Sequence, residues 1–191
     1  LSMKKLLATL VLGLLFFSAP SQADDIRDFQ IEGMSVGDSL LDYMTKQEIE
    51  NEIKLGSFNI TDKKFQRIFK FTGTFNEYEY IAAVVKPEDS KYIIYSISGM
   101  LNIPDPKVCL KKQKEIVKEL SSIFKDAKIL QGERPSAYDE TGKSKVIGVR
   151  FEFETGSVSV VCYDLAEHMK KPSGLDVSIE NKEFIKWLSQ Y

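Results

Sequence analysis

One segment constrains the fold of this chain more than any other: a long amphipathic helix expected over residues 107–126. Its apolar residues recur at helical spacing, while lysines and two glutamates cover the opposite face. Three strand-like runs precede this helix and three follow it. We therefore expect the helix to pack against a sheet built from two β-meanders. Its apolar stripe comprises Cys109, Ile116, Val117, Leu120, Ile123 and Phe124.

The remaining patterns complete the predicted fold. Shorter helices are expected over residues 37–44, from Lys46 to near Lys54 behind a Thr45–Glu48 capping box, and after Asn181 at the C-terminal end. The sequence predicts one α+β domain over residues 24–191. It contains a mainly antiparallel sheet of about six strands in two meanders, packed by the long central helix, two short N-terminal helices and a C-terminal helix. The strand-like runs are residues 65–71, 78–85, 92–100, 146–153, 157–163 and 175–179, with a further short strand possible at 129–130.

The first 23 residues have the pattern of a secretory signal peptide. Lys4 and Lys5 precede an apolar run over residues 6–17, and small residues lead to a cleavage site after Ala23. The apolar run is shorter than the roughly 20 residues that a membrane-spanning helix needs. We therefore expect a periplasmic or secreted protein with no membrane span after signal cleavage.

Charge and cysteine content narrow the possible partners and the compartment. The chain has 26 basic and 28 acidic residues, and most of the basic residues are lysines scattered among acids. A nucleic-acid site favours clustered, arginine-rich surface, so we expect no nucleic-acid partner. In an exported chain two cysteines most simply form one disulfide. Helical spacing puts Cys109 on the buried stripe, and strand alternation puts Cys162 on the face that the helix covers, so the two are expected to pair.

Few residues indicate chemistry. His168 is the only histidine, and Asp164 and Glu167 flank it in a polar segment. It is a possible general base or single metal ligand, but a solvated loop histidine fits the same pattern because a metal site needs three or four convergent ligands. No serine occupies a nucleophile-elbow context, and neither a phosphate-binding glycine loop nor a metal-spaced cysteine set occurs. We therefore expect no catalytic residue, metal or cofactor.

The run IEGMSVGDSLLDYM at residues 31–44 loosely resembles the strand, turn and helix that open small envelope proteins of the BamE/SmpA type. It is also similar to openings of uncharacterised exported proteins of marine alphaproteobacteria. The resemblance covers a short part of the chain. The BamE pattern includes a lipobox cysteine, which this chain lacks near its signal cleavage site, so no family function is carried over.

The polar segment from Gln131 to Lys145 is the predicted contact surface. It is the longest polar, Gly/Pro-punctuated stretch in the chain, and long loops in compact domains are usually functional or mobile. Tyrosines on the strands at 78–85 and 92–100 offer an alternative surface. The sequence favours a non-catalytic binding or accessory module that contacts an envelope or extracellular protein. The alternatives are a carrier of a small apolar ligand between helix and sheet, and a small hydrolase using His168. The predicted contact residues are Arg134, Tyr138, Asp139 and Glu140.

Overall fold

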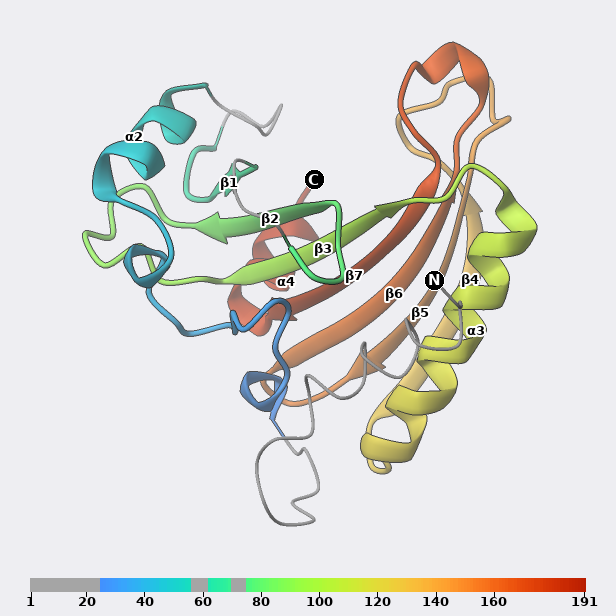
Figure 1. The fold of residues 1–191 in the computed structure, drawn as a ribbon, viewed down its shortest axis with the longest axis horizontal. Coiled ribbons are helices and arrows are strands. Elements are labelled where there is room, and N and C mark those ends of the chain that lie inside the picture. Colours follow the sequence, from blue (N-terminus) through green and yellow to red (C-terminus); the bar gives the residue numbers. More distant parts are fainter. Residues whose placement is uncertain (1–24, 56–61, 70–74) are drawn as a thin grey trace.

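The computed structural model describes residues 25–55, 62–69 and 75–191, so the predicted signal peptide lies outside the described residues. Within them the chain forms one antiparallel sheet of seven strands with helices against it, which confirms the predicted α+β class (Figure 1). None of the described helices is both long and apolar enough to cross a membrane. The helices are α2 (Lys46–Leu55), α3 (Pro106–Ile123) and α4 (Lys182–Leu188), and the strands are β1 (Gln66–Ile68), β2 (Tyr80–Val85), β3 (Ser96–Asn102), β4 (Lys128–Pro135), β5 (Lys145–Glu152), β6 (Gly156–Asp164) and β7 (Gly174–Asn181).

The strand order is β1-β2-β3-β7-β6-β5-β4. Each half of the sheet is a meander, β1 to β3 and β4 to β7, as the sequence predicts. The two meanders are joined where the last strand returns beside β3, in register from Ser96 opposite Glu180 to Asn102 opposite Gly174. This pairing makes one continuous sheet whose two edge strands are β1 and β4.

Helix α3 lies across one face of the sheet (Figure 1). It begins where expected, because the Asp105 side chain accepts hydrogen bonds from the backbone N–H groups of Lys107 and Val108. Its apolar stripe faces β6 and β7, and the predicted disulfide is confirmed: Cys109 is bonded to Cys162 with their Cα atoms 6.0 Å apart. The bond fastens the first turns of α3 to the second meander.

The helix ends at Ile123, three residues before the predicted end. Phe124 leaves the helical conformation, and its side chain turns into the core. There its ring centroid lies 5.6 Å from that of Phe151 and 5.0 Å from that of Phe153. Burial of an aromatic ring outweighs another turn of exposed helix, which explains the early end.

The predicted helix at residues 37–44 is wrong apart from one 3-10 turn, η2 (Leu40–Asp42). The backbone N–H of Gly37 donates to the carbonyl of Ile94, and that of Leu40 donates to the carbonyl of Tyr92. The carbonyl of Asp38, which a helix would use to accept from Asp42, instead accepts from the N–H of Ile94. These pairings also delay the start of β3 from the predicted residue 92 to Ser96. The capping box that starts α2 is confirmed, because Thr45 and Glu48 exchange hydrogen bonds.

The opposite face of the sheet is covered at one end by α4. Asn181 caps this helix as predicted, through a hydrogen bond from the backbone N–H of Phe184. Phe184 and Trp187 are buried against Phe65, with ring centroids 5.4 and 5.2 Å from its own. Phe65 belongs to this aromatic cluster and lies just before β1, which begins at Gln66 and ends at Ile68. Residues 70 and 71 of the predicted strand lie outside the described residues.

The largest difference from the sequence prediction is β4. Residues from Gln131 onward were expected to form a loop, but the ladder with β5 continues to Pro135 opposite Lys145. All eight residues of β4 are exposed, because the strand lies at the edge of the sheet. An exposed edge strand needs no alternating apolar residues, so the pattern used to predict strands could not reveal it.

Candidate functional site: two joined loops at one end of the sheet

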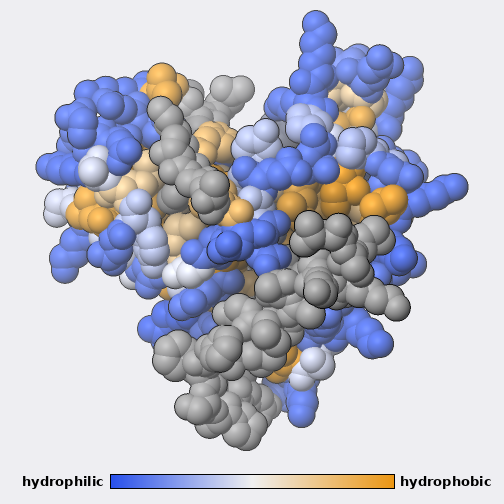
Figure 2. Space-filling view, in the orientation of Figure 1, coloured by the Kyte–Doolittle hydropathy of each residue, from blue (hydrophilic) through white to orange (hydrophobic). Residues whose placement is uncertain are grey.

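Two loops project together from one end of the sheet: the β4–β5 loop (residues 136–144) and the β6–β7 loop (residues 165–173). They stand side by side in Figure 1 and form a mostly hydrophilic lobe in Figure 2. The backbone N–H of Ala166 donates to the hydroxyl of Ser144 at 3.0 Å. A second contact joins the His168 ring to the Asp139 carboxylate, also at 3.0 Å. The loops therefore form one surface.

Asp139 organises the β4–β5 loop from inside. Its side chain is buried, and its oxygens accept hydrogen bonds from the backbone N–H and hydroxyl of Thr141 and from the backbone N–H of Ser144. Hydrogen bonds from Ser144 and Thr141 hold the pKa of this carboxyl well below its usual range. The carboxylate is thus ionised and turned away from solvent, so Asp139 shapes the surface that its neighbours present.

His168 lies in the 3-10 turn η3 (Glu167–Met169), and its side chain is 46% exposed. Because an ionised carboxylate only accepts, the Nε2 atom of His168 must carry the proton that Asp139 receives. The acid that contacts this histidine is Asp139, 29 residues away in sequence, and not one of the flanking acids Asp164 and Glu167. Among the described residues no serine, threonine or cysteine side chain hydrogen-bonds to the imidazole.

The exposed part of the lobe carries two of the four predicted contact residues, Tyr138 and Glu140. Tyr138 is 84% exposed at the loop tip, and the Lys171 ammonium from the other loop lies 5.7 Å from its ring centroid. Glu140 is exposed beside it, whereas Arg134 is exposed on β4. Tyr138, Lys171 and Glu140 thus form a mixed aromatic and charged surface of the kind that anchors protein contacts.

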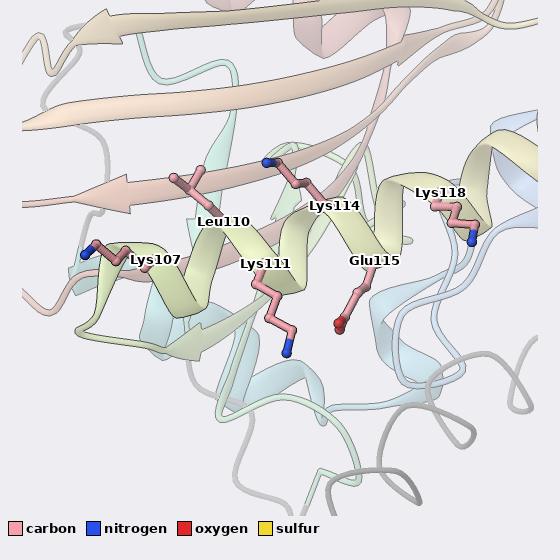
Figure 3. Close-up of a pocket in the computed structure, with 6 residues that line it drawn as sticks. All are labelled: Lys107, Leu110, Lys111, Lys114, Glu115 and Lys118. Atoms are coloured by element: carbon pink, nitrogen blue, oxygen red, sulfur yellow. The ribbon is translucent and has the colours of Figure 1, made fainter.

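A basic face runs along α3 from the same end of the molecule. The backbone N–H of Ile103, just before α3, donates to the carbonyl of Ser173 in the β6–β7 loop. From there a shallow depression of about 510 Å³ follows the helix (Figure 3). Its described lining comes entirely from α3 and consists of Lys107, Leu110, Lys111, Lys114, Glu115 and Lys118.

The other two surfaces considered from the sequence differ from expectation. The interface between α3 and the sheet is filled by buried side chains, including Gln113, whose Nε2 donates to the carbonyls of Ile147 and Val160 at 2.8 and 2.9 Å. The strand tyrosines do not share one face: Tyr92 is buried, whereas Tyr80 is 58% exposed. No single tyrosine platform is present among the described residues.

The sheet face that lies opposite α3 carries a group that the sequence analysis did not single out. Asp176 on β7 lies between Met100 and Val161 of the neighbouring strands. Burial raises its pKa to about 7, and the nearby charge of Arg67 acts in the opposite direction. The alternation of Leu175, Val177 and Ile179 places Asp176 on this face, and that was the available signal.

No three His, Cys, Asp or Glu side chains in the described ranges converge in a way that could hold a metal ion. Comparison of the chain with protein-family models, curated proteins and solved structures found no match.

Proposed function

We propose that this protein is an exported, non-catalytic binding module that recognises another envelope or extracellular protein through the joined loops. One observation carries the proposal: buried Asp139 ties two loops from different hairpins into a single surface with Tyr138 at its tip. Tyrosine supplies a large contact area with few rotatable bonds, and such residues dominate many interfaces. The Cys109–Cys162 disulfide supports export, because disulfides persist in oxidising compartments.

The charges near the lobe indicate which partner surface fits. Lys171 lies beside Tyr138, and the α3 depression adds Lys107, Lys111 and Lys114. An acidic partner surface would complement this row, and the aromatic ring would supply the anchor. Binding should therefore weaken as salt concentration rises.

Photocrosslinking tests the proposal. A photoreactive residue at position 138 should capture a partner in extracts of the exporting cell. The variant Tyr138→Ala should lower recovery of that partner at least tenfold, as loss of an anchor residue does. The matched control is Tyr80→Ala, which removes an exposed tyrosine from β2, outside the two joined loops. Undiminished recovery with Tyr138→Ala, or an equal loss with Tyr80→Ala, would contradict the assignment.

A small hydrolase is the second candidate, because the contact between His168 and Asp139 resembles the base and orienting acid of hydrolytic sites. Asp139 would hold the ring while Nδ1 served as the base toward a water molecule. Assays with ester, peptide and glycoside substrates address this candidate. Turnover that is lost in folded His168→Ala protein and retained in Tyr138→Ala would favour the enzyme over the binding module.

A further inference from the structure

The outer edge of β4 is an open row of backbone hydrogen-bonding groups. Two bonds establish which residues of β4 point outward, both at 2.9 Å. Ser136 N–H donates to Ser144 O and continues the β4–β5 ladder, and Phe153 N–H donates to Gly156 O and continues the β5–β6 ladder. Both place Ser136 and every second residue before it on the side of β4 that faces β5. Because inward and outward groups alternate along an antiparallel strand, the N–H and C=O groups of Ile129, Gln131 and Glu133 point away from β5. Within the described chain, β5 is the only strand that pairs with β4.

This edge differs from the opposite one in length and cover. The edge strand β1 has three residues, and α2 packs beside it. β4 has eight residues, and Ile129 and Leu130 are 47% and 41% exposed. Long exposed edges of this kind pair readily with another extended chain.

Gly132 lies in the middle of β4, opposite Gly148 of β5. A Cβ atom added there would meet nothing within 4 Å. Glycine weakens a strand interior, and within strands it often marks a place where another backbone approaches closely. A Cβ atom projects from a face of the sheet, so this open space means that the sheet face beside the edge is clear and that position 132 can accept a side chain.

We infer that β4 pairs with β4 of a second copy of this chain, antiparallel about a twofold axis at Gly132, to form one continuous sheet. Like charges disfavour two neighbouring registers, even though Lys128 and Glu133 also pair with Glu152 and Lys145 of their own chain, and an axis at Leu130 would pair fewer residues of β4. With the axis at Gln131, Lys128 would face Arg134 of the other copy, and with the axis at Glu133 two carboxylates would face each other.

With the axis at Gly132, no like charges are opposed. Leu130 faces Arg134 of the second copy, and Gln131 faces Glu133, where the outward N–H and C=O groups of both residues can bond. Pro135, which has no N–H, lies at an outward position and contributes only its carbonyl. The second copy is therefore the occupant whose sequence fits the edge.

The first test is the mass of the intact exported protein across a range of concentrations, by sedimentation. Wild type should reach twice the monomer mass. Gln131→Pro removes only an outward N–H, so the monomer should keep its fold while the dissociation constant rises about a hundredfold or more. Gln131→Ala is the matched control and should still dimerise. A wild-type monomer at every concentration, or a Gln131→Pro dimer as tight as wild type, would overturn the inference.

A charge pair then tests the register. Gly132→Lys and Gly132→Glu both have room in the monomer, but each should weaken self-pairing because it sets two like charges opposite each other. Mixing the two variants should restore a dimer of one copy of each. Failure of the mixture to associate would refute the axis at Gly132. Crosslinks from position 131 to a different protein alone would replace the second copy with a peptide partner. Because these variants leave Tyr138 intact, their outcome is separate from that of the proposed function.

Discussion

Removal of the Cys109–Cys162 disulfide should cost several kcal/mol of stability. The bond joins residues 53 apart in sequence, and both cysteines are buried, at 1% and 2% exposure. Cross-linking a loop of this length stabilises the folded state by about 4 kcal/mol, because it limits the unfolded chain. Replacing both cysteines with alanine adds the loss of two buried sulfurs, about 1 kcal/mol each.

Two samples separate these contributions. Reduced wild type keeps both sulfurs and should lose about 4 kcal/mol, whereas Cys109→Ala/Cys162→Ala should lose about 6 kcal/mol. Against the 5–15 kcal/mol typical of natural domains, either loss leaves a marginal protein. The double variant should not respond to reductant, which makes it the control for reductant effects.

Urea unfolding followed by fluorescence provides the measurement, because Trp187 is the only tryptophan and is 3% exposed. It lies on α4, on the face opposite the disulfide, so its signal reports unfolding of the whole sheet. The unfolding slope should also rise, since an uncrosslinked chain exposes more surface. A loss below about 1 kcal/mol in both samples would refute the reasoning that the bond constrains the unfolded chain.

Two further changes test polar groups that are packed against the two faces of the sheet, Gln113 on α3 and Asp176 on β7. Gln113→Leu should cost about 1–3 kcal/mol in urea unfolding, because the carbonyls of Ile147 and Val160 lose a buried donor; stability equal to wild type would show that these carbonyls do not need it. For Asp176 the folded pKa is raised from 3.8 to about 7, so the folded state holds its proton more tightly and stability is lost as pH rises from about 4 to about 7. Asp176→Asn should remove up to about 4 kcal/mol of that loss, and thermal melts of wild type and variant that stay parallel between pH 4 and pH 8 would contradict it.

Signals read within a few residues were sufficient for much of the fold. Asp105 and Asn181 cap the helices that follow them, and Thr45 with Glu48 starts α2, because a cap depends only on backbone groups within one turn. The disulfide was predictable for the same reason: helical and strand periodicity separately place Cys109 and Cys162 on facing surfaces.

Only the tertiary structure decided which distant backbone groups pair. Residues 37–44 have a helical pattern, but hydrogen bonds to the segment at 92–94 prevent the helix. Only residues 129–130 of β4 have a strand pattern, yet the ladder from β5 extends along all of it, since an edge strand needs a hydrogen-bonding neighbour and no buried face.

The candidate site shows the same division. Tyr138 and Glu140 were identified from their polar, punctuated segment, and both are exposed. The contact of His168 with Asp139 had no sequence signal, because it joins two loops from different hairpins that only strand pairing brings together. The sequence therefore determined the helix caps, the disulfide pairing and the apolar faces of most elements. The hydrogen-bond partners available in the assembled sheet decided where β4 lies and which two loops meet.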